Sequence, residues 1–433
     1  MSFTVCAINS PSLFALVDGN NFFVSCERVF NPSLNNKPVI VLSSNDGCAI
    51  ARSNEAKALG IAMAAPLHTF AHLIKTHGIK TLSCNFELYG DMSNRMMHTL
   101  QRFAPDVDIY SIDEAFLDIS RLNHNDYSLF AQSIYDTILK HIGLPITIGV
   151  ARTKTLAKIA NRTAKKQQKP YLIMTAPEDA THALQTTDLS SVWGIGRALA
   201  PKLKKLGIYT AYDLAIKDPM WARKVMGLSG ERLVRELQGI ACYENREETN
   251  KKSIQVTRSF GARLKEFNDI AEAISAHATR LGEQLRQKRL LAPALSVFCR
   301  TSLYSGSTPY NGIGIIAFDT PTNDTSTLIK GALHALRQAF QPGHIYQSAG
   351  IHALDLVSEG AFKQKNLFIP PKKESETSTH SKKLNQAIDS LNQHYGKNTL
   401  FWASSGINPR YQVRQNNRSP RYTTRWEELP MVR

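Results

Sequence analysis

The sequence predicts an α+β protein built from several domains. Its 433 residues are enough for about three domains. The first part alternates short apolar runs with helical segments, a purely helical stretch follows, and a second alternating region comes after it. Hydrophobic residues make up 42% of the chain, which is typical of globular domains with proper cores.

The first 170 residues predict one mixed β-sheet covered by helices, with a small insertion. LFALVD (13–18) is a short apolar run ending in a carboxylate, as a buried strand does at a sheet edge. The helix after it ends at Asn31-Pro32, because a residue before proline avoids the helical conformation. Further strands are predicted at 37–43, at 48–52, in two runs of 107–120 that meet at 111–113, and at 146–151. Further helical segments are predicted at 53–77, with loops at Gly60 and Pro66, and at 86–103, 126–141 and 154–166.

The rest of the chain divides into segments that differ in residue pattern and composition. Residues 179–243 have helical patterns with short loops, and NREETNKKS (245–253) is a charged linker. Residues 254–357 alternate strands and helices in a second α/β unit. PPKKESETSTHSKK (370–383) is of low complexity and is expected to be disordered, and the last 50 residues offer few core candidates.

Composition excludes several classes of protein. No run approaches the ~18 apolar residues of a membrane helix. The first residues lack the basic and apolar regions of a secretory signal. Six cysteines are scattered without a CxxC pair, which favours reduced thiols over disulfides or a zinc site. A cytoplasmic protein without a membrane partner is expected.

The positive charge is unevenly distributed. The formal net charge is +16, which favours a polyanionic partner. Residues 1–120, however, hold 8 Lys and Arg against 11 Asp and Glu. An acidic first quarter joined to a basic remainder fits an enzyme whose carboxylates hold cations beside a bound polyanion.

Three acidic residues are candidates for a metal site. Asp18 ends an apolar strand, and Asp113 and Glu114 stand among apolar residues at a strand junction. Two Mg²⁺ ions about 4 Å apart would need such carboxylates for nucleotidyl transfer. The alternative is that each acid merely caps or solvates a loop. Adjacent strand residues face opposite ways, so the pair converges only if the chain bends there; otherwise Asp118 shares the face of Glu114.

LVDGNNFFVSCE, IARSNEAKALG and YSIDEAFLDIS resemble the signature segments of the Y-family translesion DNA polymerases, and the bacterial UmuC-type branch above all. The similarity continues through VWGIG to QKNLF and so covers nearly the whole chain. It implies a right-hand polymerase fold with a ferredoxin-like palm, small fingers, a helical thumb, an α/β little finger and a partly disordered basic tail. The implied boundaries are 13–30 and 85–178 for the palm, 31–84 for the fingers, 179–244 for the thumb, 245–253 for a linker, 254–357 for the little finger and 358–433 for the tail.

The resemblance also assigns roles around the nucleotide. Asp18, Asp113 and Glu114, with the main-chain carbonyl of Gly19, are the implied ligands of two Mg²⁺ ions. Phe23 is the implied steric gate against the 2′-hydroxyl of a ribonucleotide; Phe22 is its neighbour on the helix, and only one of the two can face the site. The implied contacts to the triphosphate are Arg52, Asn54, Lys57 and Lys165. Asn54 and Lys57 stand where other branches have Tyr and Arg, and a solvated basic face is the alternative for Lys165.

DNA and protein partners are implied by two further segments. VWGIGRALAPKLKKLGI reads as a helix-hairpin-helix in which Trp193 closes the first helix; Gly194, Gly196, Lys202 and Lys205 would hold a DNA phosphate. A protein-only turn is the alternative. Gln364, Leu367 and Phe368 of QKNLF resemble a sliding-clamp peptide. The tail 361–433 has 13 Lys and Arg against 5 Asp and Glu. Family resemblance adds a UmuD-type accessory subunit and a recombinase filament.

The function expected from the sequence is error-prone, template-directed DNA synthesis from dNTPs on damaged primer–template DNA, in the SOS response. One alternative is another palm-type nucleotidyl transferase, such as a cyclase. The other is a catalytically silent DNA-binding repair scaffold. The intact acids count against the scaffold, while the hairpin and the basic remainder count against the cyclase.

Overall fold

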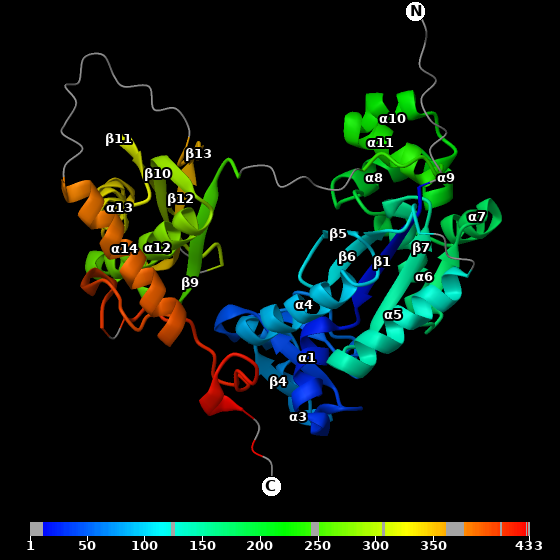
Figure 1. Ribbon diagram of the computed structural model, residues 1–433, viewed down its shortest axis with the longest axis horizontal. Coiled ribbons are helices and arrows are strands. Elements are labelled where there is room, and N and C mark those ends of the chain that lie inside the picture. Colours follow the sequence, from blue (N-terminus) through cyan, green and yellow to red (C-terminus); the bar gives the residue numbers. More distant parts are fainter. Residues whose placement is uncertain are drawn as a thin grey trace, which may run out of the picture. The chain divides into compact units, whose positions relative to one another are not determined.

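The chain forms two compact units in the computed structural model (Figure 1), which describes residues 12–122, 126–243, 251–304, 308–360, 376–407, 409–429 and 431. The first unit comprises Met1–Ser43, Gly47–Glu247 and Asn417–Arg433. The second comprises Ser44–Asp46 and Glu248–Asn416. The C-terminal residues therefore return to the first unit.

A five-stranded sheet organises the first unit. Its order is β5-β6-β1-β7-β8, with only β7 and β8 parallel to each other. The central strand β1 buries Ala15 and Val17 in one core and Leu16 in another, because successive side chains alternate between the faces. The strands are β1 (Phe14–Gly19), β5 (Asp106–Ile109), β6 (Glu114–Asp118), β7 (Ile146–Ala151) and β8 (Tyr171–Met174).

Helices cover both faces of this sheet. One face packs on α1 (Phe22–Phe30), α4 (Phe86–Leu100) and α5 (Tyr127–Ile142), and the other packs on α6 (Lys154–Lys166). Thr153 starts α6 by accepting the Leu156 N–H, and Gly143 ends α5 in the left-handed conformation. These elements confirm the mixed sheet and the helices predicted for this region.

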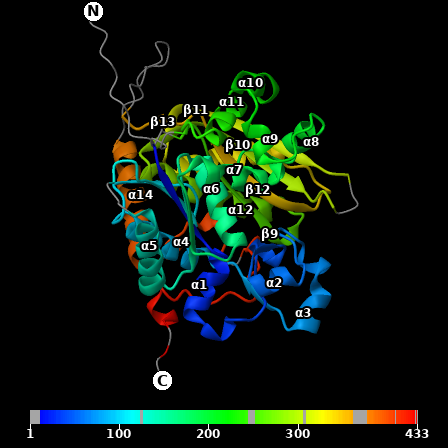
Figure 2. The ribbon, with the colours of Figure 1, turned by 90° about the vertical axis from the view of Figure 1, so that its right-hand side faces the viewer.

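A smaller sheet, β3-β2-β4, forms the insertion. It consists of β2 (Val39–Leu42), β3 (Ala49–Arg52) and β4 (Lys80–Ser83), with α2 (Asn54–Ala58), α3 (Ala71–His77) and the 3₁₀ turns η1 (Pro32–Leu34), η2 (Ser44–Asp46) and η3 (Leu67–Thr69). Figure 2 shows α2 and α3 at the end of the first unit away from α10 and α11. The sequence analysis did not predict β4 or β8.

The remaining helices of the first unit are short. They are α7 (Pro177–Gln185), η4 (Leu189–Ser191), α8 (Leu199–Lys204), α9 (Ala211–Ala215), α10 (Pro219–Met226) and α11 (Leu228–Leu237). The predicted all-helical region is confirmed. The expectation that Trp193 closes a helix is wrong: Trp193 lies in a turn after η4, and its indole N–H donates to the Tyr110 hydroxyl at 3.0 Å. Packing on the large sheet therefore fixes this residue.

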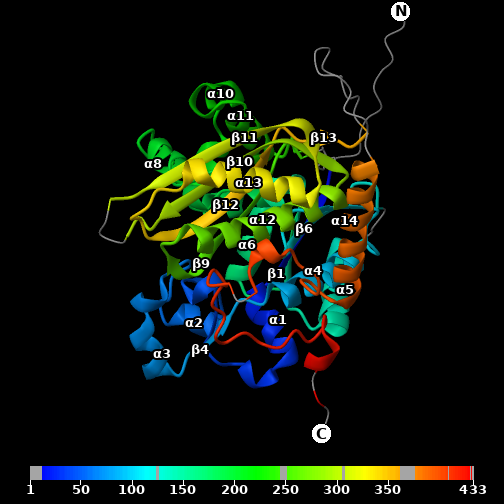
Figure 3. The same cartoon turned by 90° about the vertical axis from the view of Figure 1, so that its left-hand side faces the viewer.

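The second unit is an antiparallel sheet of four long strands and the short β13, which pairs with β10, and two helices cover one face (Figure 3). Its strand order is β11-β10-β12-β9, and its main core lies between the sheet and the helices. The elements are β9 (Ile254–Leu264), α12 (Phe267–Gln287), β10 (Leu290–Thr301), β11 (Asn311–Thr322), α13 (Thr325–Ala339), β12 (Tyr346–Leu354) and the short β13 (Val357–Ser358).

The C-terminal region is more ordered than its composition predicted. Helix α14 (Glu376–Tyr395) begins inside the low-complexity stretch 370–383, so the expected disorder is wrong from Glu376 onward. Asp389 of α14 pairs with Arg286 at 2.7 Å, and Asn385 donates to Asp324 at 2.8 Å. Tertiary contacts with the second unit stabilise a helix that its own composition does not favour. Two 3₁₀ turns follow, η5 (Ala403–Ser405) and η6 (Trp426–Glu428).

Candidate active site

The register of the large sheet brings two of the candidate acids together. Asp18 pairs directly with Glu114 across β1 and β6, so both side chains project from the same face. Asp118, on that face too, lies at the far end of β6 opposite Phe14. It accepts the Ser120 N–H at 3.0 Å and takes no part in the site.

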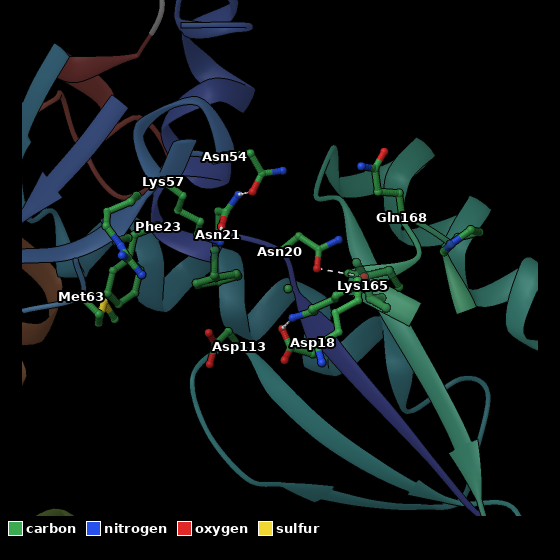
Figure 4. Close-up of a pocket in the computed structure, with 18 of the residues that line it drawn as sticks. Asp18, Asn20, Asn21, Phe23, Asn54, Lys57, Met63, Asp113, Lys165 and Gln168 are labelled. Carbon is green, nitrogen blue, oxygen red and sulfur yellow. Dashed lines mark hydrogen bonds and ion pairs between the residues drawn. The ribbon is translucent and has the colours of Figure 1, made fainter. Parts of the chain in front are cut away.

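Asp113 reaches the site because the chain turns before β6 begins. The strand starts at Glu114, and Asp113 belongs to the preceding bend. Its carbonyl accepts the Gly19 N–H at 2.8 Å, while its carboxylate accepts the Ser111 hydroxyl at 2.6 Å. The bend required by the alternation rule is therefore present, and it places Asp113 beside Asp18 at the same cavity (Figure 4).

A cavity of about 860 Å³ opens beside these acids. Eight of the nine residues predicted for the metal and nucleotide sites line it: Asp18, Gly19, Phe23, Arg52, Asn54, Lys57, Asp113 and Lys165. They come from the end of β1, the start of α1, the small sheet with α2, the bend before β6, and the last turn of α6. Positions far apart in the sequence thus converge on one cavity, as the family resemblance implied.

Lysines neutralise two of the three acids. Lys165 Nζ lies 2.5 Å from Asp18 Oδ1, and Lys158 Nζ lies 2.8 Å from Glu114 Oε1. Burial raises the pKa of Asp18 to about 6, although the Lys165 ammonium opposes the shift; the negative charges of Glu114 and Asp113 raise it further. Holding Asp18 ionised is therefore costly unless a cation stays close to it.

Glu114 differs from the other two acids. It does not line the cavity, because its carboxylate is directed to Lys158. The Lys158 ammonium lies 4.4 Å from the centroid of the Tyr110 ring and 5.5 Å from that of Trp193. In the described part of the chain, no three Asp, Glu, His or Cys side chains are gathered as a ready metal site. The donor types nevertheless fit Mg²⁺, since carboxylates and a backbone carbonyl are its preferred protein ligands.

The structure distinguishes the two phenylalanines of α1. Phe22 is 3% exposed and belongs to the core, where its ring leaves no room for a side chain at Gly19. Both residues line the cavity, but Phe23 is half-buried and stacks on Tyr89, with ring centroids 4.6 Å apart. The predicted gate residue, Phe23, is thus the one of the two whose ring stacks on the ring of Tyr89.

The cationic residues of the cavity repel one another. Burial lowers the pKa of Lys57, and the charges of Arg52 and Lys165 lower it further. Burial likewise lowers the pKa of Arg52; its Nη1 donates to the Ile61 carbonyl at 2.6 Å, and its buried Nε has no partner in the structure. Such a cluster favours a polyanionic ligand.

Sequence reasoning missed the residues that connect these groups. Asn21 has a left-handed backbone (φ 48°), accepts the Lys57 ammonium at 2.5 Å and donates to Asn54 at 3.0 Å. Asn20 accepts the Thr147 hydroxyl at 2.9 Å. The adjacent asparagines before α1 were a usable signal, because asparagine tolerates the left-handed conformation that a sharp helix entry requires.

The predicted DNA contacts lie away from the cavity. Gly194 has a positive φ of 92° in the turn before α8, and Gly196 follows it. Lys202 is in α8 and donates to the Val225 carbonyl at 3.1 Å, while Lys205 caps that helix. The clamp-like residues Gln364, Leu367 and Phe368 lie outside the described residues.

Family profiles match the chain in the order of its parts. The impB/mucB/samB family matches residues 17–162, the helix-hairpin-helix motif of that family matches 177–208, and its C-terminal domain matches 251–367. A domain of unknown function matches residues 382–432.

Similar proteins extend over almost the whole chain. Protein UmuC of Salmonella typhimurium is 39% identical over 97% of this chain and 100% of that protein. Protein MucB of Escherichia coli is 35% identical over 97% and 99%, and DNA polymerase IV of Lactococcus lactis subsp. cremoris is 27% identical over 81% and 94%. Among solved structures, a Y-family DNA polymerase chimera has a TM-score of 0.64 at 22% identity, over 80% of this chain and 99% of that chain.

The fold is therefore that of a Y-family DNA polymerase. The matched helix-hairpin-helix motif includes α7 and α8, and the sheet of the second unit lies in the region matched by the C-terminal domain. The chain belongs to the impB/mucB/samB family, and it is an error-prone DNA polymerase of the translesion class. That class acts on DNA and depends on divalent metal ions. Among the described residues, no helix is long and apolar enough to span a bilayer.

Proposed function

We propose that this chain extends a DNA primer at the cavity of Figure 4, adding template-directed deoxynucleotides and releasing pyrophosphate. The observation that carries the proposal is the composition of that cavity. One space collects the carboxylates of Asp18 and Asp113, the cations Arg52, Lys57 and Lys165, and the ring of Phe23. Carboxylates would hold metal ions, cations would bind a triphosphate, and an aromatic ring would contact the sugar.

Asp18, Asp113 and Glu114, with the Gly19 carbonyl, are the proposed ligands of two Mg²⁺ ions. When bound, these ions activate the primer 3′-hydroxyl and neutralise charge on the leaving pyrophosphate. Glu114, paired with Asp18 across the strands, would hold a metal ion once its side chain rotated away from Lys158. Asp18 would hold metal in place of Lys165, and Lys165 would then be available for the triphosphate.

The remaining cavity residues bind and select the nucleotide. Arg52 and Lys57 contact the phosphates, where their mutual repulsion is relieved by the anionic ligand. Asn54 orients Lys57 through Asn21. Phe23 lies beneath the sugar and excludes a 2′-hydroxyl, because a ring packed on Tyr89 cannot yield without giving up that stacking.

Contacts beyond the cavity are proposed from position and resemblance. Gly194, Gly196, Lys202 and Lys205 would hold a phosphate of the DNA duplex without reading its sequence. Gln364, Leu367 and Phe368 would dock on a sliding clamp. A UmuD-type accessory subunit and a recombinase filament are the further proposed partners, in the cytoplasm of a cell responding to DNA damage.

Primer extension with the purified full chain tests the proposal. Extension that needs template, dNTP and Mg²⁺, and that stops with a chelator, is the expected result. DNA binding without extension under any metal condition would favour the silent scaffold. Template-independent formation of a cyclic nucleotide would favour the cyclase.

A further inference from the structure

Residues 417–422, here called the C-terminal segment, pack beside the start of α4. The Ser83 N–H donates to the Asn417 carbonyl, the Asn417 N–H donates to the Ser83 hydroxyl, and both distances are 3.0 Å. Arg418 pairs with Ser83 as a parallel β-bridge. The Tyr422 ring stacks on Phe30 of α1, with ring centroids 4.9 Å apart. Backbone and aromatic contacts thus attach the segment to both β4 and α1.

Asn85 connects the segment to the helix that carries Tyr89. Its side-chain oxygen accepts the Leu88 N–H and caps α4. Its amide nitrogen donates to the Ser419 hydroxyl at 2.9 Å and to the carbonyls of Ser419 and Pro420, each at 3.1 Å. Asn85 is 2% exposed, so the C-terminal segment supplies the acceptors that this buried amide needs.

Ser419 and Tyr89 share one buried acceptor. The Oε1 atom of Glu27 accepts the Tyr89 hydroxyl at 2.6 Å and the Ser419 hydroxyl at 2.9 Å. Glu27 is 2% exposed and Tyr89 is fully buried. A buried carboxylate depends on such donors, because water cannot replace them.

The series of contacts that begins at the C-terminal segment ends at Phe23, the residue proposed to lie beneath the sugar. The Tyr89 ring stacks on Phe23 at an interplanar angle of 16°, and the Phe86 ring meets Phe23 edge-on at 5.8 Å. Phe23 itself lines the cavity. Ser419, Glu27 and Tyr89 therefore form a continuous series of contacts behind the ring, all within the first unit.

We propose that the C-terminal segment sets how strongly the polymerase excludes ribonucleotides, with Ser419 as a positioning residue that holds Tyr89, and through it Phe23, by way of Glu27. This inference rests on the proposed role of Phe23 as the steric gate. If the hydrogen bond of Ser419 is removed, Glu27 and the Tyr89 ring gain freedom, and Phe23 can move away from a 2′-hydroxyl.

The test measures kcat/KM for rNTP relative to dNTP with the full chain. Ser419→Ala and Tyr89→Phe are each expected to raise the ratio about 3- to 10-fold, since each removes one hydrogen bond to a charged buried group. Thr424→Ala, an exposed position close by, is the matched control and leaves the ratio unchanged. A general loss of folding lowers both rates and cancels in the ratio.

Comparison with Phe23→Ala separates the two proposals. If Phe23→Ala raises the ratio, Ser419→Ala is expected to have no further effect in that background. A raised ratio in Phe23→Ala with a normal ratio in Ser419→Ala overturns the inference and leaves the gate intact. An unchanged ratio in Phe23→Ala overturns the gate, and the inference with it.

Substitutions at Glu27 provide a second measurement if Ser419→Ala folds poorly. Glu27→Gln keeps an oxygen that accepts both hydroxyls, so it should retain the parent ratio. Glu27→Leu removes the acceptor and should raise the ratio by the same 3- to 10-fold, roughly. Equal ratios in these two variants would contradict the inference.

Discussion

At Asp18, burial and neighbouring charge act against each other. Desolvation and the nearby acids raise its pKa to about 6, while Lys165 opposes them. The side chain is 16% exposed and faces a cavity rather than a structural partner alone. Perturbed carboxylates in a cleft are typical of functional sites. Burying this carboxylate lowers the stability of the fold, and the proposed benefit of the arrangement is metal binding.

Asp18→Ala, Asp113→Ala and Glu114→Ala should each lower the rate of primer extension by at least about 10³-fold, the loss expected when a catalytic metal is no longer held. DNA affinity should remain, because none of these acids contacts phosphate elsewhere. Asp118→Asn is the matched control: it is on the same strand and face, yet at the far end of β6. Near-normal extension by any alanine variant would remove that residue from the proposed ligands.

At the scale of elements, helix α6 explains why its sequence contains no acid. Its residues Lys154, Lys158 and Lys165 pair with Asp108, Glu114 and Asp18 on the sheet. Positions i, i+4 and i+11 lie within about 40° of one another around a helix, so one face presents all three lysines. The solvated basic face considered for Lys165 is therefore not what the structure shows. The positive charges of these three lysines neutralise the three acids that face the helix from the sheet.

The innermost of these pairs tests the role of the helix in stability. Lys154 and Asp108 are 3% and 9% exposed and 2.8 Å apart. Lys154→Met should lower the free energy of unfolding by about 3 kcal/mol, because it leaves a buried carboxylate uncompensated. Lys154→Met combined with Asp108→Leu should recover most of that loss in urea unfolding. Lys140→Met, at an exposed position of α5, is the control. A single variant as stable as the parent would contradict this account.

The hairpin before α8 makes a separate prediction about DNA binding. Affinity for primer–template should fall steeply with salt, since phosphate contacts dominate such binding. Neutralising Lys202 and Lys205 together should flatten the log–log slope by up to about one unit for each DNA phosphate that the hairpin no longer binds. Neutralising the exposed Lys75 and Lys140 instead provides a control of equal charge. If both pairs flatten the slope equally, net charge and not the hairpin is responsible.

For the whole molecule, the path of the chain is the notable feature. It passes into the second unit after Glu247 and returns to the first at Asn417. The last residues therefore complete the unit that holds the cavity, although the sequence places them beyond the little finger. A truncation that removes residues 417–433 is thus expected to affect the catalytic unit itself, and not only partners of the tail.

The two units should also differ in their response to acid. His277 of the second unit is buried, and burial lowers its pKa from 6.5 to about 4, with the Arg258 charge adding to the effect. In the unfolded chain the His277 imidazole is protonated below pH 6.5. In the folded unit it stays neutral until the pH falls to about 4. Stability is thus complete above pH 6.5 and falls between these values, by on the order of 3 kcal/mol.

Hydrogen exchange of α12 in the full chain measures this effect. Comparing the parent with His277→Gln at each pH removes the contribution of other titrating groups. The variant should lose less protection than the parent between pH 6.5 and 4. Identical pH dependence in both proteins would show that His277 does not titrate in this window.

Local sequence determined most of the strands, most of the helices and the chemical character of the site. The apolar run before Asp18, the acid-free α6 and the motif around Asp113 each carry their information within a dozen residues, so periodicity and resemblance could predict them. Only tertiary structure decided that Phe22 is buried in the core while Phe23 is half-buried and stacks on Tyr89, and that Glu114 pairs with Lys158. It alone decided that Ser419 returns to Asn85, 334 positions earlier in the chain. Contacts at such separation depend on how whole elements pack, and no local pattern encodes that packing.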